Sequence, residues 1–375
     1  MKIFTSLSYY KPHISGLTIC VQRLIAGLSK KNFEFTVLTS KHKNTLLEYE
    51  ESKKIKIIRS PVLATLGKAP IMPRYLFQAI REIKKSDLVW IHLPQAEGLI
   101  VAFVAKLFGK KIITTVHCLP LLPDGWQRFF FQKPFDLLNN LTIRLADKVT
   151  YYTQDYAENT KELLHIPSKS SYILPPIPDE GRRLKAEGRK KMDRLTIGFA
   201  GRIAEDKGFE YLLEALTLLK DEGKNFDLFI AGNMNAVGES RYIKKIKNRL
   251  KNIKFKVNFA GEIYPENMFE FYMKIDLLVL PSVNRTEAFG LVQAEAMLVG
   301  IPVVVSDLPG VRMPVNLTGG GIIVKPRDTR ALAKAIWLCL KKKINRIGLA
   351  RKSALIFRPE KTLEDYAEVF RQVKN

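Results

Sequence analysis

The sequence predicts an α/β protein made of two doubly wound domains, and three observations support this fold class. Short runs rich in Val, Ile and Phe alternate with amphipathic stretches of helical period, which is the pattern of parallel strands wrapped by helices. The alternation occurs twice, on either side of a segment rich in Pro and basic residues. The length of 375 residues is also two to three times that of a single domain of ~100 to 200 residues.

The first alternation begins at the N-terminus. Amphipathic stretches, such as 17–31 and 74–85, lie between its apolar runs. We expect seven strands there, at residues 2–6, 35–39, 55–59, 87–92, 111–117, 148–153 and 171–174. Together they predict one parallel sheet covered by helices.

The second alternation follows a break in composition. Residues 174–194 combine prolines and glycines with a run of basic side chains, which favours a linker. Six further strands are expected, at residues 195–200, 226–232, 254–261, 276–282, 301–306 and 321–325. Residues 358–375 have an amphipathic helical pattern. We predict a domain of residues 1–178 completed by a helix at 358–375, a linker at 179–194, and a second domain at 195–357.

The charge and the cysteines restrict the protein's class. Lys and Arg number 61 against 37 Asp and Glu, a net charge of +24 that points to anionic partners. Three widely spaced cysteines without a CxxC pair argue against a zinc cluster or a disulfide framework. The N-terminus does not read as a secretory signal, and the longest apolar run, 99–109, is too short for a membrane span. We therefore expect a cytoplasmic protein in a reducing compartment.

Several nucleotide-binding motifs are absent from the sequence. No GxGxxG follows a candidate strand, and no Gly-Lys pair precedes Ser or Thr, which argues against dehydrogenases and P-loop NTPases. No Asp-x-Asp pair is available to hold a divalent metal on a nucleotide diphosphate. Any phosphate must therefore be bound by protein groups.

The first candidate site follows the strand expected at 195–200. The sequence GRIAEDKG places Arg202 and Lys207 in a turn between this strand and a helix. A planar guanidinium and a compact ammonium at such a turn can neutralise a diphosphate. The alternative is an ordinary glycine turn with solvated charges.

The second candidate site contains two glutamates. Glu287 lies in an expected loop and Glu295 on the following helix. Residues 288–291 would form the start of that helix, where backbone N–H groups and the helix dipole favour an anion. Glu295 could accept hydrogen bonds from ribose hydroxyls, and Glu287 from hydroxyls of a transferred group. The alternative is two solvated glutamates.

These two segments together resemble the paired signature of the retaining glycosyltransferases of family four. The resemblance is carried by GRIAEDKG and by TEAFGLVQAEAMLVGIPVV, and it extends through IDLLVLPS, SDLPG and GGGIIVKPRDTRALAKAI. It implies the GT-B fold, in which two Rossmann-like domains face a central cleft. In that family the Arg and Lys hold the donor diphosphate, and the two glutamates contact the donor sugar and the ribose. The resemblance assigns donor binding to Gly16, Arg202, Lys207, Ile263, Phe289, Gly290, Leu291 and Glu295.

The N-terminal half carries the resemblance more loosely. Ser15 and Gly16 stand where the family usually has a glycine pair. His117 follows a strand where the family often has His-Asp, although Cys118 comes next here. The implied catalytic residues are His117, Glu287, Arg202 and Lys207. Without the resemblance, His117 would read as a buried, hydrogen-bonded side chain.

The resemblance implies transfer of a sugar from a nucleotide diphosphate sugar to a hydroxyl acceptor with retained anomeric configuration. It implies neither a cofactor nor a metal, and it leaves UDP, GDP and ADP open as the nucleotide. A sugar-nucleotide epimerase and a phosphorylase are alternatives on the same fold. A basic nucleic-acid-binding protein is a third alternative, but no zinc-finger spacing, RNP-like strand or basic heptad region supports it.

The segment 123–140 points to the acceptor. It combines Arg128 and Lys133 with five aromatic residues: Trp126, Phe129, Phe130, Phe131 and Phe135. Aromatic and basic side chains together suit a segment that enters an anionic lipid surface. We expect peripheral attachment to the inner face of the membrane and an acceptor of the lipid-linked or cell-envelope glycan class. The alternative is a loop and helix packed on the sheet.

Overall fold

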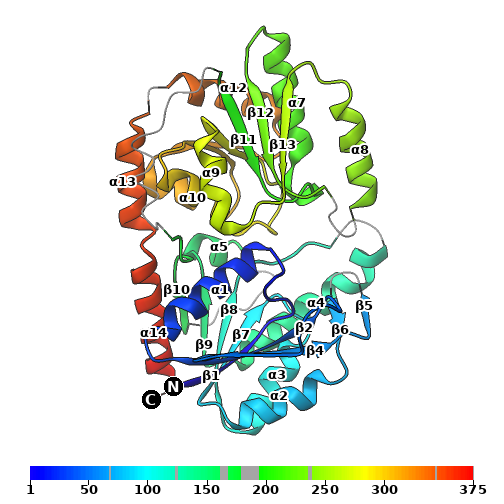
Figure 1. Cartoon of the computed structure of the whole chain (residues 1–375), viewed down its shortest axis with the longest axis vertical. Coiled ribbons are helices and arrows are strands. Elements are labelled where there is room, and N and C mark those ends of the chain that lie inside the picture. The colour runs from blue at the N-terminus through cyan, green and yellow to red at the C-terminus, as the bar shows by residue number, and fades with distance from the viewer. Residues whose placement is uncertain are drawn as a thin grey trace. The chain divides into compact units, whose positions relative to one another are not determined.

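The computed structural model describes residues 1–66, 69–122, 126–160, 168–178, 194–234, 239–342 and 344–374, with only the backbone of Trp126 and Gln127. The chain divides into two compact units (Figure 1). Unit 1 comprises Met1–Pro176 and Glu360–Asn375, and unit 2 comprises Ile177–Pro359. The linker expected at 179–194 lies outside the described residues except for Arg194.

Unit 1 is built on an eight-stranded sheet. Its strands are β1 (Lys2–Ser6), β2 (Glu34–Lys41), β3 (Tyr49–Ser52), β4 (Ile55–Pro61), β7 (Leu88–Leu93), β8 (Lys111–Val116), β9 (Lys148–Tyr151) and β10 (Ser170–Tyr172). Their order across the sheet is β10-β9-β8-β7-β1-β2-β4-β3. All neighbours pair in parallel except β3, which is antiparallel to β4. The seven strands expected from the sequence are all present.

Three further strands of unit 1 were not expected. β3 has the sequence YEES, and it is a mostly exposed edge strand without the apolar alternation that marks a buried one. β5 (Ala64–Leu66) and β6 (Ala69–Ile71) form a separate two-stranded antiparallel sheet of three residues each. Such short or polar strands carry no periodic signal.

Helices cover both faces of the sheet in unit 1. They are α1 (Gly16–Ser29), α2 (Tyr75–Lys84), α3 (Gly98–Leu107), α4 (Trp126–Leu145), α5 (Gln154–Glu158) and α14 (Pro359–Lys374). Val89 and Ile91 of β7 share a buried core with residues of α2 and α3. The intervening Trp90 points to the other face, where its ring lies 5.0 Å from that of Phe370 in α14.

Unit 2 contains a six-stranded, fully parallel sheet. Its strands are β11 (Thr196–Ala200), β12 (Asp227–Ala231), β13 (Lys256–Gly261), β14 (Leu277–Leu280), β15 (Val303–Ser306) and β16 (Gly321–Val324). Their order is β13-β12-β11-β14-β15-β16, so the chain moves outward from β11 first in one direction and then in the other. All six strands expected in this half are present.

The helices of unit 2 also cover both faces of its sheet. They are α7 (Phe209–Asp221), α8 (Ser240–Leu250), α9 (Met268–Met273), α10 (Leu291–Leu298), α11 (Met313–Thr318), α12 (Thr329–Lys341) and α13 (Arg346–Ile356), with short 3₁₀ turns η1 (Glu205–Lys207) and η2 (Pro265–Asn267). One core is shared by α7 and α12, and a second by α9, α10, α11 and α13. The predicted α/β class with two doubly wound domains is therefore confirmed.

Candidate functional site

The strand order of unit 2 defines where a ligand can bind. β12 and β14 flank β11 on opposite sides, so the segments that leave the carboxyl ends of β11 and β14 separate there. Open parallel sheets bind ligands outside the carboxyl ends of strands at such a switch point. The segment after β11 contains Arg202 and Lys207, and the segment after β14 contains Glu287. Three residues singled out from the sequence thus lie at the switch point.

The two segments approach each other closely because of Gly208. This residue has a left-handed backbone with φ of 61°, and it links η1 to α7. A Cβ at this position would lie 2.1 Å from the carbonyl oxygen of Pro281. The N–H of Val283 also donates to the carbonyl of Asp206 at 3.0 Å. Only glycine permits this approach, and the approach brings Lys207 to Glu287.

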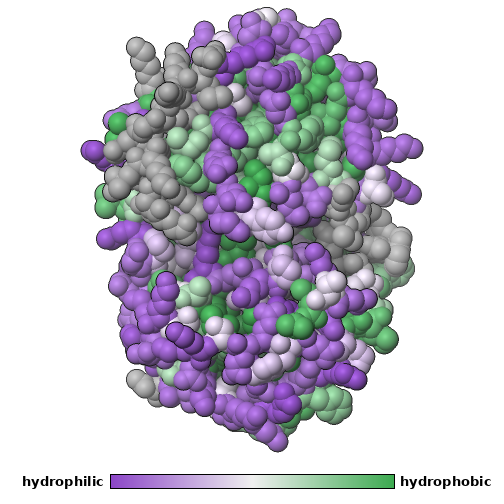
Figure 2. Space-filling model, viewed as in Figure 1, coloured by the Kyte–Doolittle hydropathy of each residue, from purple (hydrophilic) through white to green (hydrophobic). Residues whose placement is uncertain are grey.

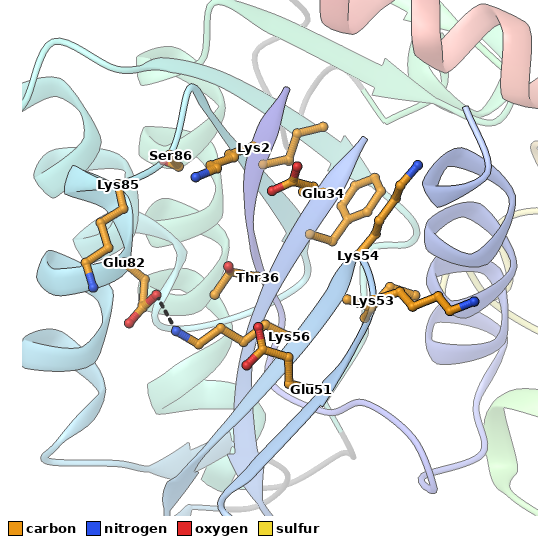
Figure 3. A pocket seen from close by; sticks show the side chains of 13 residues that line it. Lys2, Glu34, Thr36, Glu51, Lys53, Lys54, Lys56, Glu82, Lys85 and Ser86 are labelled. Carbon is orange, nitrogen blue, oxygen red and sulfur yellow. Dashed lines mark hydrogen bonds and ion pairs between the residues drawn. The ribbon is translucent and has the colours of Figure 1, made fainter. Parts of the chain in front are cut away.

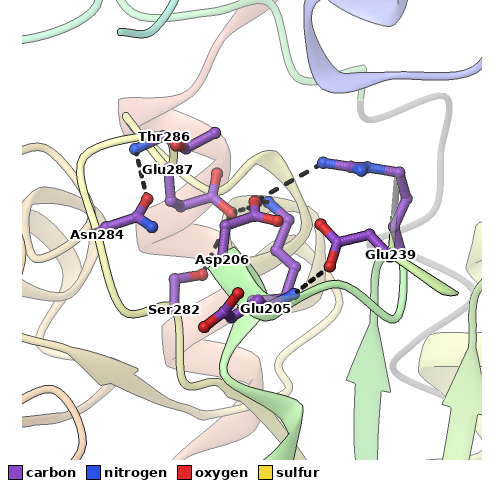
Figure 4. Close-up of polar contacts among 9 residues, drawn as sticks. Glu205, Asp206, Glu239, Ser282, Asn284, Thr286 and Glu287 are labelled. Carbon is purple, nitrogen blue, oxygen red and sulfur yellow. Dashed lines mark hydrogen bonds and ion pairs between the residues drawn. The ribbon is translucent and has the colours of Figure 1, made fainter. Parts of the chain in front are cut away.

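Lys207 lies between two carboxylates, those of Asp206 and Glu287, which are labelled in Figure 4. Its Nζ lies 2.6 Å from Oε2 of Glu287 and 3.8 Å from Oδ2 of Asp206. The guanidinium of Arg202 lies 3.7 Å from the same Asp206 oxygen. Ser282 adds a hydrogen bond from Oγ to Oε2 of Glu287 at 3.4 Å. The sequence reasoning missed Asp206 and Ser282 as members of the cluster, although Asp206 is part of the GRIAEDKG segment.

The cluster is largely shielded from solvent. The side chains of Lys207 and Glu287 are 17% and 15% exposed, so Glu287 is not a solvated glutamate. Burial acts to lower the pKa of Lys207, but the carboxylates of Glu287 and Asp206 outweigh it and raise that pKa above its ordinary value. Lys207 is therefore firmly charged. Arg202 is more exposed, and its guanidinium can turn toward a ligand.

A conformationally fixed turn leads into α10. Gly290, with φ of 74°, precedes the helix, and no side chain caps its N-terminus. The buried amide of Gln293 donates to the carbonyls of Phe289 and Val311 at 2.5 and 2.8 Å, which holds the turn in place. An uncapped N-terminus with a fixed backbone is suited to an anion. Leu291 is the first residue of this helix.

Glu295 lies on the buried side of α10. The hydroxyl of Tyr272 donates to its Oε2 at 2.9 Å. The interpretation of Glu295 as a solvated glutamate therefore does not hold, and its contact with a ribose stays a prediction. Phe289 is a core residue whose ring packs edge to face with Phe357 at 6.1 Å, and the partly buried Ile263 follows β13 at the carboxyl edge of the sheet.

His117 occupies a buried hydrogen-bonded chain in unit 1. Its Nε2 shares a 2.9 Å hydrogen bond with Nδ1 of His92, and its Nδ1 is hydrogen-bonded to the hydroxyl of Tyr152. Burial lowers the pKa of His117 to about 3, so the ring is neutral near neutral pH. Both ring nitrogens already have partners here, and a catalytic role stays a prediction. His92 was overlooked, although it lies near the carboxyl end of β7, the strand next to β8, which His117 follows.

Gly16 begins α1 in the same unit. Ser15 caps the helix by accepting a hydrogen bond from the Thr18 N–H at 3.2 Å, and Oγ1 of Thr18 accepts from the Ser15 N–H at 2.9 Å. This reciprocal capping box satisfies two N–H groups of the first turn. It gives Ser15 a local structural role where a glycine was expected.

A pocket of about 190 Å³ lies at the amino ends of three strands in the sheet of unit 1 (Figure 3). It is lined by Lys2, Glu34 and Ile55 at the amino ends of β1, β2 and β4, and by an ion pair of 2.8 Å between Lys56 and Glu82. Parallel α/β sheets bind their ligands at the carboxyl ends of strands. The pocket is therefore not assigned to the substrate.

No group of three or more His, Cys, Asp or Glu side chains is placed to hold a metal ion in the ranges given above. Within the same ranges, no helix combines the length and the apolar character needed to cross a membrane.

Comparisons with known proteins give the family. Residues 14–180 match the family described as Glycosyltransferase Family 4, and residues 181–353 match the family described as Glycosyl transferases group 1. An uncharacterized glycosyltransferase of Methanocaldococcus jannaschii is 35% identical over 354 residues, which cover 89% of this chain and 87% of that protein.

Solved structures give the fold. A sucrose-phosphate synthase from Thermosynechococcus elongatus has a TM-score of 0.78 at 19% identity, covering 99% of this chain and 98% of its own. HepE from Anabaena, whose structure is described as a complex with UDP and glucose, has a TM-score of 0.76 at 18% identity, covering 99% of both chains. Both the resemblance and the fold predicted from the sequence are confirmed: the chain belongs to the family 4, group 1 glycosyltransferases and has the GT-B fold.

Proposed function

We propose that the protein transfers a sugar from a nucleotide diphosphate sugar to a hydroxyl acceptor, with retained anomeric configuration and without a metal or cofactor. The observation that carries this proposal is the meeting of Lys207, Arg202 and Glu287 at the switch point of unit 2. Two cations and a helix N-terminus there provide positive charge for a diphosphate, and a carboxylate provides an acceptor for sugar hydroxyls.

In this proposal, residues 195–357 bind the donor. Lys207 and Arg202 hold the diphosphate with the N-terminus of α10, Glu287 contacts the sugar, and Glu295 contacts the ribose. The ammonium of Lys207 has three N–H donors, so it can bind a diphosphate while it remains paired with Glu287. The complex of HepE with UDP-glucose supports a uridine donor, with GDP and ADP as the alternatives.

The chemical step requires charge stabilisation on the leaving group. The bond between the anomeric carbon and the diphosphate oxygen breaks, and the acceptor oxygen bonds to that carbon on the same face. The acceptor proton passes to the departing diphosphate, so atoms and charge balance. Preorganised cations stabilise the charge that develops on the diphosphate. His117, placed near the reacting sugar by the family resemblance, would help to position it.

Residues 1–178 with the helix at 358–375 bind the acceptor in this proposal. We propose a lipid-linked or cell-envelope glycan precursor, met by a cytoplasmic protein held on the inner face of the membrane. The net charge of +24 and the exposed side chains of Phe129 and Phe130 support a lipid surface.

The test is a thermal-shift screen of UDP, GDP and ADP in the presence of EDTA. A ligand that binds only the folded state raises the melting temperature, and one of the three should do so without metal. No shift with any of them would remove the donor assignment. Incubation with the matching nucleotide sugar then separates the alternatives, because transfer or hydrolysis releases the nucleoside diphosphate, whereas an epimerase returns an altered nucleotide sugar.

A phosphorylase would form a sugar phosphate only when inorganic phosphate is supplied, and this reaction serves as the matched control. Duplex DNA tests the nucleic-acid alternative. Its binding should be weak and should disappear with added salt if the basic surface has no nucleic-acid role.

A further inference from the structure

Helix α4 buries several polar side chains and exposes several large apolar ones, although its Ile143 lies in the core. The side chains of Gln132, Asn139 and Thr142 are buried, whereas Phe129 and Phe130 are 78% and 61% exposed. Leu137 is also exposed. A helix on a soluble surface normally turns its apolar side toward the core and its amides toward water. The exposed phenylalanines therefore indicate an apolar environment outside the protein.

Hydrogen bonds of the buried side fix this orientation. Gln132 accepts from the Leu122 N–H at 2.8 Å and donates to the Pro120 carbonyl at 3.2 Å. Asn139 accepts from the Gln95 N–H at 3.3 Å and donates to the Phe135 carbonyl at 2.7 Å. Rotating α4 to bury the phenylalanines would break the bonds to Leu122, Pro120 and Gln95 and leave buried polar groups unpaired, whereas the bond to Phe135 lies within the helix. The outward direction of Phe129 and Phe130 is thus a property of the fold.

Helix α3 exposes a second stripe of apolar side chains. Phe103 and Leu107 are 65% and 70% exposed, and Ile100 is exposed on the same stripe because spacings of three and four residues share a helix face. Other residues of α3, including Val101 and Val104, lie in the core under the sheet, so the stripe points away from it. α3 packs against α4.

The exposed area is large for a soluble surface. At ~200 Å² per ring, Phe129 and Phe130 on α4 expose about 280 Å², and Phe103 on α3 exposes about 130 Å². Large apolar side chains that are exposed together can mark an interaction surface. In Figure 2, hydrophobic residues interrupt the hydrophilic surface on the right-hand side of unit 1, where Figure 1 draws α4, β5 and β6.

The charges around this surface favour anionic lipid over a second protein copy. Helices α2, α3 and α4 together contain six Lys or Arg and two Asp or Glu. One of the two acids, Glu82, is buried and paired with both Lys56 and Arg81, whereas Lys133 and Arg144 are exposed. Cations around an apolar surface are attracted to anionic head groups, whereas two identical cationic surfaces repel each other.

We propose that unit 1 docks on an anionic membrane through exposed apolar side chains of α3 and α4. These side chains, here called the α3–α4 apolar face, are Ile100, Phe103, Leu107, Phe129, Phe130 and Leu137. The phenylalanines and leucines enter the interface between head groups and acyl chains, and the basic residues contact the head groups. The proposal deepens the proposed function, on which it rests for the membrane-proximal acceptor. It assigns a docking role to α3, whose apolar run the sequence indicated only as too short to span a membrane.

The test is co-sedimentation of the full chain with vesicles of phosphatidylcholine, with and without phosphatidylglycerol. Two double variants each replace part of the face: Phe103→Ser with Leu107→Ser on α3, and Phe130→Ser with Leu137→Ser on α4. The control is Leu47→Ser with Leu355→Ser, which removes leucines of similar exposure, 66% and 67%, elsewhere. We expect the parent and the control to bind anionic vesicles, and each face variant to bind at least tenfold more weakly.

Three outcomes would overturn the proposal. The first is that the parent does not bind anionic vesicles at low salt. The second is that the α3 variant binds vesicles as tightly as the control. The third is that the face variants change the sedimentation coefficient of the protein without vesicles, which would make the face a contact between copies. The nucleoside diphosphate shift is measured on the same samples. If the parent binds vesicles but no nucleotide, the proposed donor site is contradicted and the docking surface is not. If the parent binds nucleotide but no vesicles, only the docking surface is contradicted.

Discussion

Replacing Lys207 by Met is the sharpest test of the donor site. The substitution keeps most of the side-chain volume and removes the charge that lies 2.6 Å from Glu287 and 3.8 Å from Asp206. If Lys207 holds the diphosphate, the variant loses one charge-assisted hydrogen bond to the ligand. Such a bond contributes about 1.5 to 3 kcal/mol, which corresponds to a roughly 10- to 150-fold weaker Kd.

The same substitution also destabilises unit 2. Breaking a buried ion pair by removing one partner costs about 3 to 5 kcal/mol, and partial exposure of both side chains reduces this to about 2 to 3 kcal/mol. The melting temperature should then fall by roughly 5 to 10 °C. Adding Glu287→Gln to Lys207→Met removes the unpaired carboxylate. It should restore part of the melting temperature without restoring nucleotide affinity.

The assay is isothermal titration of UDP, or of whichever nucleoside diphosphate gives a thermal shift, into each protein with EDTA present. Lys220→Met is the matched control, because it removes the same charge from α7, where Nζ donates to the Asn225 side chain at 3.2 Å. The assignment of Lys207 to the diphosphate would be refuted if Lys207→Met bound the nucleotide with the affinity of the parent. It would also be refuted if Lys220→Met lost as much affinity as Lys207→Met.

Three further predictions follow from the geometry. Gly208→Ala places a Cβ 2.1 Å from a backbone carbonyl oxygen, so it should lower the free energy of unfolding measured in urea. The control is Gly223→Ala, where φ is also positive but the Cβ would meet no atom within 4 Å. Gly208→Ala should cost more than the ~1 kcal/mol expected for this control. The pKa of His117 is about 3 in the folded chain and 6.5 ordinarily. Below pH 6.5 the unfolded chain therefore takes up a proton that the folded chain does not. The free energy of unfolding should fall there by up to ~1.4 kcal/mol per pH unit. His117→Gln should flatten this slope, and an unchanged slope would contradict the assignment. Glu295→Gln should weaken UDP about tenfold and leave the binding of inorganic pyrophosphate unchanged, whereas equal losses would argue against a ribose contact.

The sequence alone determined the strands, the repeated α/β alternation and the segments that carry the site. Burial on both faces makes each parallel strand a run of apolar residues, so β11 and β14 are readable from composition within a few positions. The polar edge strand β3 lacks this signal and was missed. Arg202 and Lys207 were singled out because a glycine turn after a buried strand is a local pattern.

The tertiary structure decided which distant residues meet. Lys207 and Glu287 are 80 positions apart, and their contact depends on β14 pairing with β11. His117 is neutral because it is buried against His92 and Tyr152, each on another strand or just after one. Helix α14 belongs to unit 1 because Phe370 packs on Trp90. The buried polar side of α4 likewise depends on other segments, because the Leu122 and Gln95 N–H groups donate to its amide oxygens and the Pro120 carbonyl accepts from Gln132. Apolar periodicity specifies local elements, whereas the pairing of polar atoms depends on long-range packing that a single sequence does not display.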